Sequence, residues 1–156
     1  MGAVMVEFRS ESVSSELSAT LLTEYFEFRA ATFPVAQGYV AKHPDPHDFE
    51  EPHGVFLVAH DDSHEAIGCG GVRDLGDDRW EIKHLWIRPA ARGLGLGRRM
   101  LTELERRAEA MGARELVLDT NASLEAAGSL YRSAGFESIE PYNDNPNANL
   151  WFAKNL

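Results

Sequence analysis

The segment from Arg92 to Gly97 holds the residues whose types and spacing point most directly to chemistry. Its glycines alternate with leucines, after an apolar stretch that ends at Pro89 and before a run with a helical pattern. A glycine-rich turn that opens a helix presents backbone N–H groups without intrahelical partners, and the helix dipole adds positive charge there. Arg98 and Arg99 add full charges. The segment therefore predicts a ligand that carries several phosphates.

Two other glycine-rich phosphate motifs do not fit these residues. Gly93, Gly95 and Gly97 alternate, whereas the dinucleotide-binding fingerprint requires G-x-G-x-x-G. No Gly-Lys-Ser/Thr follows, which excludes a P-loop. A glycine-rich loop standing alone is more often an ordinary tight turn, so a second motif is needed to support a ligand site.

That second motif is SLYRSAGF, from Ser129 to Phe136, which follows the apolar run RELVLDT. The ordered pair resembles the signature of the GNAT superfamily of N-acetyltransferases. In that signature Arg-x-x-Gly-x-Gly follows an apolar strand, and a strand and a short helix ending in Leu-Tyr-x-x-x-Gly-Phe come later. The resemblance implies acetyl-CoA as co-substrate and transfer of its acetyl group to a primary amine by direct attack.

The resemblance also assigns residues to the cofactor. The backbones of Leu85, Trp86 and Ile87 are expected to bind the acetyl carbonyl and the pantetheine amides as an added strand would. The turn is expected to bind the diphosphate through Arg92, Gly93, Leu94, Gly95, Leu96, Gly97 and Arg98. The family often has an asparagine seven residues before the tyrosine of the Leu-Tyr pair, where this chain has Leu124. Asn121 and Ser123 are the candidates to replace it.

An amine of pKa ~10.4 must lose a proton before it attacks, so a base is expected in the site. Glu81 occupies the strand position of the catalytic glutamate in the histone-acetylating branch of the superfamily. The alternative is that Glu81 forms an ion pair with Lys83 or Arg79 at a strand entrance. His84 has a suitable intrinsic pKa and is the second candidate, with a packing role as its alternative.

Strand alternation predicts that Glu81, Lys83, Leu85 and Ile87 share one face, with His84 on the other. Tyr131, in the Leu-Tyr pair, is the implied general acid for the departing thiolate, and its alternative is a core tyrosine. The family builds its substrate side from the first helices, the loop after them and the last hairpin. The corresponding candidates here are Tyr25, Phe26, Phe33, Tyr39, His84 and Tyr142. The residues NDNPN at 143–147 are predicted to form a solvated turn.

Composition limits the classes of partner. A chain of 156 residues with 44% hydrophobic content is long enough for one domain over residues 1–156. The net charge of −10 argues against nucleic acid. One cysteine and no apolar N-terminal segment predict a cytoplasmic protein without a membrane span. The histidines of KHPDPHDFEEPH lack metal-ligand spacing, so a hydrated loop is expected and no metal.

The pattern predicts strands at 3–8, 55–60, 66–73, 79–87 and 116–118 and a last strand in the C-terminal apolar stretch. Helices are predicted after Ser14 or Ser15, after the turn and before Gly135. This order indicates a mixed, mostly antiparallel α/β sheet with helices on both faces. In the GNAT fold, which it matches, the two middle strands splay apart. The prediction is a GNAT N-acetyltransferase for a small-molecule amine, which family analogy makes a homodimer. The alternatives are an acyl-CoA sensor of the same fold and a metal-dependent hydrolase built on the histidine segment.

Overall fold

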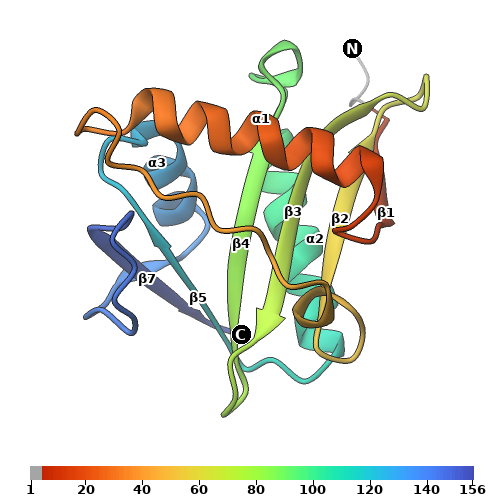
Figure 1. Ribbon diagram of the computed structural model, residues 1–156. Helices are drawn as coiled ribbons and strands as arrows, with labels where there is room; N and C mark the ends of the chain where they lie inside the picture. Colours follow the sequence, from red (N-terminus) through yellow and green to blue (C-terminus); the bar gives the residue numbers. More distant parts are fainter. Residues whose placement is uncertain (1–4) are drawn as a thin grey trace.

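The computed structural model describes residues 5–156 (Figure 1). Its strands are β1 (Glu7–Ser10), β2 (Gly54–His60), β3 (Ala66–Asp74), β4 (Arg79–Ile87), β5 (Glu115–Thr120), β6 (Glu137–Ser138) and β7 (Leu150–Asn155). Its helices are α1 (Glu16–Thr32), α2 (Leu96–Ala110) and α3 (Glu125–Ser133), with the 3-10 turns η1 (Pro46–Phe49) and η2 (Pro89–Ala91). Residues 3 and 4 of the expected first strand lie outside the described residues. In the described range no helix is long and apolar enough to cross a membrane.

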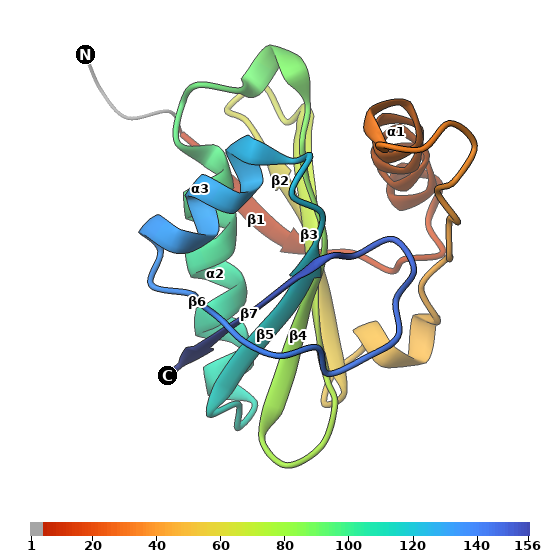
Figure 2. The ribbon, with the colours of Figure 1, turned by 90° about the vertical axis from the view of Figure 1, so that its left-hand side faces the viewer.

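Within residues 5–156 the strands form a single sheet in the order β1-β2-β3-β4-β5-β7-β6. Every paired neighbour is antiparallel except β4 and β5. Figure 2 shows α1 on one face of the sheet and α2 with α3 on the other. The expected mixed sheet with helices on both faces is therefore confirmed.

The two middle strands separate, and this separation creates the space for the site. β4 and β5 pair only from Arg79 to Glu81, opposite Glu115 to Val117. Beyond these residues β4 runs on beside β3, whereas β5 pairs with β7 along its whole length (Figure 1). The sheet therefore opens between the carboxyl-terminal halves of β4 and β5, as expected for the fold.

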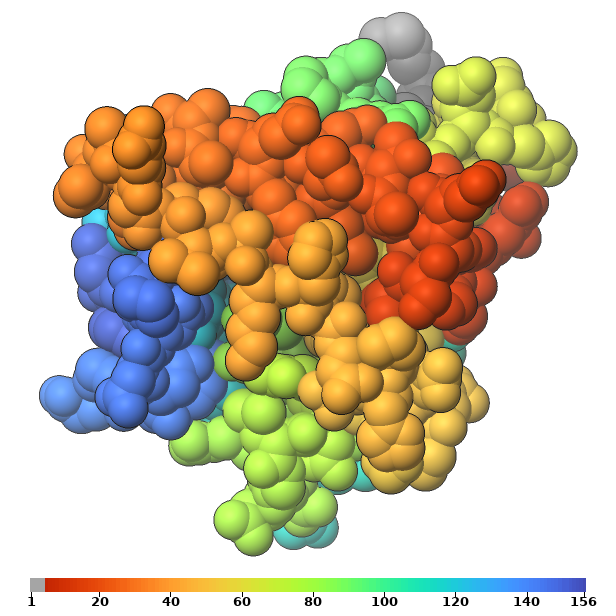
Figure 3. Space-filling model, viewed as in Figure 1, coloured from red at the N-terminus to blue at the C-terminus, as the bar shows by residue number. Residues whose placement is uncertain are grey.

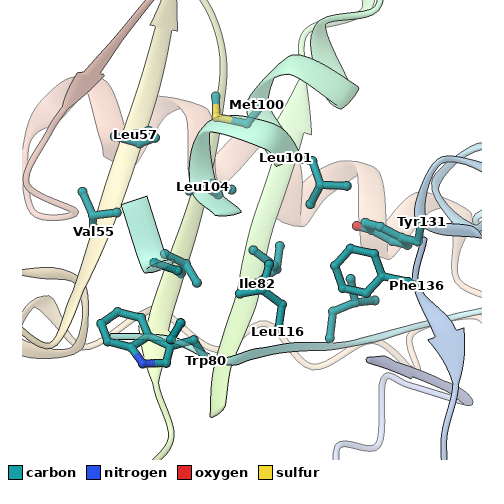
Figure 4. Close-up of a cluster of buried hydrophobic side chains, with 14 of the residues drawn as sticks. Val55, Leu57, Trp80, Ile82, Met100, Leu101, Leu104, Leu116, Tyr131 and Phe136 are labelled. Carbon is teal, nitrogen blue, oxygen red and sulfur yellow. The ribbon is translucent and has the colours of Figure 1, made fainter. Parts of the chain in front are cut away.

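Each face of the sheet has its own apolar core. The core under α2 contains Met100, Leu101 and Leu104 from the helix, with Tyr131 and Phe136 at its α3 end (Figure 4). The core under α1 contains Leu21, Leu22 and Phe26 with Phe49, Phe56 and Trp86. Because both faces are covered, all seven residues of β2 are buried. Ser15 caps α1 by accepting a hydrogen bond from the Ser18 N–H at 3.1 Å.

Candidate active site

A bulge in β4 sets which side chains reach the site. Cys69 lies opposite Trp86 and Gly71 lies opposite Lys83, so His84 and Leu85 together oppose the single residue Gly70. His84 takes up the extra residue with φ of 58°. The regular alternation of side chains between the two faces of the sheet is therefore interrupted at His84.

The predicted distribution of side chains on β4 is wrong for this reason. Leu85 packs in the core under α2, whereas the His84 ring lies 6.0 Å from Phe49 in the core under α1. Glu81 faces the same side as His84, since it is joined through Arg73 to Asp48 beside Phe49. His84 therefore shares a face with Glu81, and Leu85 does not.

A cleft of about 1170 Å³ occupies the opening between β4 and β5. Its wall is formed by α1, the segment 39–49, the end of β4, the turn 91–98, the end of β5, α3 and the loop 143–147. The cleft is thus bounded by segments from both halves of the chain. Among the expected cofactor and catalytic residues, those on its wall are Leu85, Trp86, Ile87, Arg92, Gly93, Gly95, Leu96, Gly97, Arg98, Ser123 and Tyr131.

The glycine turn has the geometry of an anion site. Gly93 and Gly95 have φ of 80° and 75°, values that residues with a Cβ adopt at a cost, and no atom lies within 4 Å of a Cβ placed at either position. Within residues 5–156, the N–H groups of residues 93–98 make no hydrogen bond, and the first bonded N–H of α2 is that of Arg99, to Gly95 O. Several N–H groups without partners therefore lie at the start of α2, a helix of 15 residues, where the dipole is positive.

The arginines beside the turn are held by the protein. Arg92 donates to Ile87 O at 3.0 Å, and its guanidinium lies 4.9 Å from the centre of the Trp86 ring. Arg98 donates to the Ser133 hydroxyl at 2.8 Å and so joins α2 to α3. Trp86 in turn donates to Glu24 on α1 at 3.2 Å. Both arginines lie on the cleft wall.

Five of the expected residues do not line the cleft. Leu94 lies in the turn and is 52% exposed. Asn121 holds the chain locally, because its Oδ1 accepts from Ser123 N and its Nδ2 donates to Asn147 O. Neither Asn121 nor Ser123 begins α3, which starts at Glu125 without a side-chain cap. The other three residues off the wall are Glu81, Phe33 and Tyr142.

Glu81 is held in a buried network. The residue is 1% exposed; its Oε1 accepts from Arg73 Nε at 3.0 Å, and its Oε2 accepts from the Tyr142 hydroxyl at 2.7 Å. Arg73 also pairs with Asp48 at 3.1 Å. The expected alternative of a pair with Lys83 or Arg79 is wrong, because the partner is Arg73 on β3. Both carboxylate oxygens are engaged, which does not favour the role of base.

This network predicts a stability role for Glu81. Glu81→Ala should lower the free energy of unfolding by ~2–4 kcal/mol, because Arg73 loses one of its two carboxylates and the Tyr142 hydroxyl loses its acceptor. Glu115→Ala, which breaks a half-exposed pair with Arg79, should cost ~1 kcal/mol or less. Urea unfolding measures both values. Equal losses in the two variants would contradict the buried network.

His84 lies on the cleft wall and has a buried ring nitrogen, Nδ1, without a hydrogen-bond partner in residues 5–156. The rings of Tyr25 and Phe26 meet it edge-on, with centroids 5.7 and 5.8 Å away. Burial lowers the pKa of His84 to about 3, and the nearby charges of Lys83 and Arg73 act in the same direction. The imidazole is therefore neutral near pH 7.

The neutral state of His84 should make the fold sensitive to acid. The unfolded chain takes up a proton on this imidazole below pH ~6.5, but the folded protein does so only near pH 3. Its contribution is fully present above pH 6.5 and is lost as the pH falls, by at most ~1.4 kcal/mol per pH unit. His84→Asn tolerates a positive φ and should flatten the stability curve from urea unfolding between about pH 4 and 7. Parallel curves for the two proteins would contradict the burial argument.

Tyr131 lies at the α3 side of the cleft. Its ring packs against Phe136 and Phe152, with centroids 6.0 and 6.3 Å away. Its hydroxyl makes no hydrogen bond to the described residues. Burial raises the pKa of the phenol above its usual value, and the charge of Tyr25 acts in the same direction. The hydroxyl is therefore protonated near pH 7, as an ordinary phenol is, and burial makes it a weaker acid.

The side of the cleft where the amine substrate is expected, called here the acceptor side, is formed by α1, the segment after it and the β6–β7 connection. Of the expected substrate residues, Tyr25, Phe26, Tyr39 and His84 line the wall. Phe33 instead packs on Tyr39, with ring centroids 5.8 Å apart, and Tyr142 bonds to Glu81.

Residues 143–147 form a wall of the cleft, although their sequence predicts a solvated turn. The Asn147 side chain accepts from Val40 N at 3.0 Å and donates to Val40 O at 2.6 Å. This pair joins the segment after α1 to the β6–β7 connection, which are neighbours on the face seen in Figure 3. Asn143 donates to Asp119 at 2.7 Å and accepts from Trp151 at 2.9 Å. The loop is thus held in place across the acceptor side.

Sequence reasoning missed several charged residues on this wall, among them Arg29 and Asp119. Arg29 follows Leu22 and Phe26 at i+7 and i+3, so the available signal was an arginine on an apolar helix face. Asp119 ends the buried run of β5 and pairs with Lys83 at 3.7 Å. No group of three or more His, Cys, Asp or Glu able to hold a metal occurs in the described residues.

The comparisons agree with this geometry. Residues 8–136 match the Acetyltransferase (GNAT) family, and the chain belongs to that family. An uncharacterized N-acetyltransferase of Schizosaccharomyces pombe is 40% identical over 66% of this chain, and the match spans 64% of that relative's own length. Acetyl-CoA is the acetyl donor of GNAT enzymes, which confirms the expected cofactor.

Solved structures confirm the fold. An acetyltransferase of the GNAT family from Staphylococcus aureus superposes with a TM-score of 0.81 at 16% identity, covering 97% of this chain and 99% of the other. A GNAT family acetyltransferase from Elizabethkingia anophelis with acetyl-CoA bound gives a TM-score of 0.66 at 16% identity, covering 97% and 98%.

Proposed function

We propose that this protein is an N-acetyltransferase that moves an acetyl group from acetyl-CoA to the primary amine of a small molecule. The observation that carries the proposal is the position of the unpaired N–H groups of residues 93–98 at the mouth of the opening between β4 and β5. A diphosphate fits these donors, and a narrow pantetheine arm fits the opening beside them. When bound, acetyl-CoA supplies a thioester that an amine attacks directly.

In this proposal the residues of β4 bind the cofactor, and Tyr131 on α3 acts as the general acid. The backbone of Leu85, Trp86 and Ile87 lines the opening and binds the arm, as the family resemblance implies. Tyr131, on the cleft wall, donates its hydroxyl proton to the departing sulfur, as the family resemblance implies. Two residues expected to take part, Glu81 and Tyr142, act instead by holding Arg73 and the start of β4 in place.

His84 orients the amine. The residue lines the cleft, and its buried Nδ1 is the one buried polar side-chain atom without a partner among residues 5–156. An amine N–H that reaches this atom when the ring turns toward the cleft would satisfy it. Because its pKa is about 3, the imidazole is a weak base, so water in the cleft carries the proton of the amine away.

The test is a screen of primary amines with the purified protein and acetyl-CoA. Free thiol release measures turnover, and mass spectrometry identifies the acetylated product. We expect at least one class of amine to accelerate thiol release. Tight binding of acetyl-CoA by calorimetry, with no amine that accelerates thiol release, would favour the non-catalytic sensor and overturn the proposal.

A further inference from the structure

The last turn of α1 places a buried cation on the acceptor side of the cleft. Arg29 is 8% exposed and lines the wall. Its Nη1 donates to the Tyr25 hydroxyl at 3.0 Å, and its Nη2 donates to Asn147 O at 3.3 Å. Its guanidinium lies 5.0 Å from the centre of the Tyr39 ring. All of these partners are neutral.

Arg29 differs in this respect from the arginines that the fold uses for structure. Among the described residues Arg73, Arg79 and Arg88 each pair with a carboxylate within 4 Å, whereas no carboxylate lies that close to Arg29. A guanidinium has five N–H donors, and only two of those of Arg29 are used. A buried charge without a counter-charge is costly, so a group that supplies one would bind favourably.

The carboxylates on the same wall are already engaged or exposed. Asp48 pairs with Arg73, and Asp119 pairs with Lys83 and accepts from Asn143. The other three carboxylates on the wall, Asp45, Glu125 and Asp144, are exposed. The wall of the cleft around Arg29 therefore lacks a counter-charge from the described residues of the protein itself.

A purely structural role for Arg29 explains less of this arrangement. The residue does join α1 to the loop 143–147, and the negative end of the helix dipole favours a cation there. A neutral amide donor could make both hydrogen bonds without the cost of a buried charge. The Arg29 side chain lies on the cleft wall near the rings of Tyr25 and Tyr39, where an anionic ligand in the cleft could contact it.

We propose that the acceptor amine also carries a carboxylate, as an amino acid does, and that this carboxylate binds the Arg29 guanidinium. The planar fork of arginine fits a carboxylate through two parallel hydrogen bonds. Tyr25 and Tyr39 flank the pair and fix the plane of the guanidinium. This inference rests on the proposed N-acetyltransferase function and names its class of substrate.

The experiment compares amino acids with their amides, such as leucine with leucinamide and methionine with methioninamide. In the wild type, kcat/KM should favour the carboxylates by at least about 10-fold. Arg29→Gln should lower kcat/KM for the carboxylates about 10–100-fold, the loss expected for a bidentate charged hydrogen bond, and leave the amides within about 3-fold. Arg29→Lys keeps the charge and should retain part of the preference.

Arg132→Gln is the matched control, since it makes the same change of charge on an exposed helix residue outside the cleft wall. It should leave the preference unchanged. Equal losses for acids and amides in Arg29→Gln, or a wild-type preference for the amides, would overturn the proposal. Urea unfolding and CoA calorimetry on each variant verify that the fold and the cofactor site are intact.

A binding measurement separates this inference from the proposed function. Calorimetry with N-acetylleucine in the presence of CoA should show binding that Arg29→Gln weakens about 10-fold or more, whereas N-acetylleucinamide should bind weakly to both proteins. If no amine is acetylated but this difference holds, the proposed function fails and the anion site stands. If amines are acetylated without this difference, the assignment of Arg29 fails alone.

Discussion

Replacing Tyr131 with phenylalanine is expected to lower kcat about 100-fold, the lower end of what a general acid contributes. The variant keeps the ring that packs against Phe136 and Phe152, so the core under α2 should be unchanged. The affinity for CoA should stay within about 2-fold, because the hydroxyl makes no hydrogen bond that holds the cleft together in residues 5–156. Steady-state thiol release and CoA calorimetry measure the two quantities.

The chemistry of the leaving group distinguishes an acid from a packing residue. A thioester whose thiol is more acidic, such as an acetylated thiophenol, needs less help from a proton donor. The ratio of wild-type to Tyr131→Phe rates should therefore shrink with that donor. An unchanged kcat with acetyl-CoA, or the same ratio with both donors, would remove Tyr131 from the proton transfer.

Gly95→Val is expected to weaken CoA binding about 10–100-fold. Gly95 precedes α2 with φ of 75°, and a β-branched residue there costs ~1–3 kcal/mol or forces the turn into another conformation. Either outcome moves the N–H groups of residues 93–98 away from the diphosphate. Calorimetry should show the loss with CoA but not with pantetheine, which has no diphosphate.

Gly76→Val is the control for backbone strain alone. Gly76 has φ of 93° in the turn between β3 and β4, and no atom lies within 4 Å of a Cβ placed there, as at Gly95. It does not line the cleft. The two variants should lose similar stability, and only Gly95→Val should lose CoA affinity. If the affinity for CoA were unchanged in Gly95→Val, the assignment of the turn to the diphosphate would be refuted.

The local sequence predicted most of the elements, although the first strand was expected at 3–8 and lies at Glu7–Ser10. It also indicated the segments where we propose that the cofactor binds. Hydrophobic periodicity and turn residues predicted β4 at its observed bounds, and the order of strands and helices predicted the mixed sheet. The turn 92–97 could be recognised in the sequence because its expected role depends on the backbone. The alternating glycines and the helix that follows them are adjacent in sequence. Features of this kind are determined by residues that are close together in the sequence.

The side chains on the acceptor side could be placed only with the tertiary structure. The bulge at His84 arises where β4 meets the glycines of β3, and no rule of strand alternation within β4 predicts it. Glu81 finds its partners on β3 and, at Tyr142, 61 residues further along the chain. Arg29 meets Asn147 across 118 residues.

The sequence by itself therefore determined where this chain is expected to hold a diphosphate, and only the fold decided which side chains face the acceptor. The physical reason is the range of the forces involved. Helix starts, glycine turns and strand periodicity depend on neighbours in the chain. The charge state of His84 and the missing counter-charge of Arg29 depend on burial by segments that are distant in the chain. The hydrophobic periodicity of one segment carries no information about such contacts.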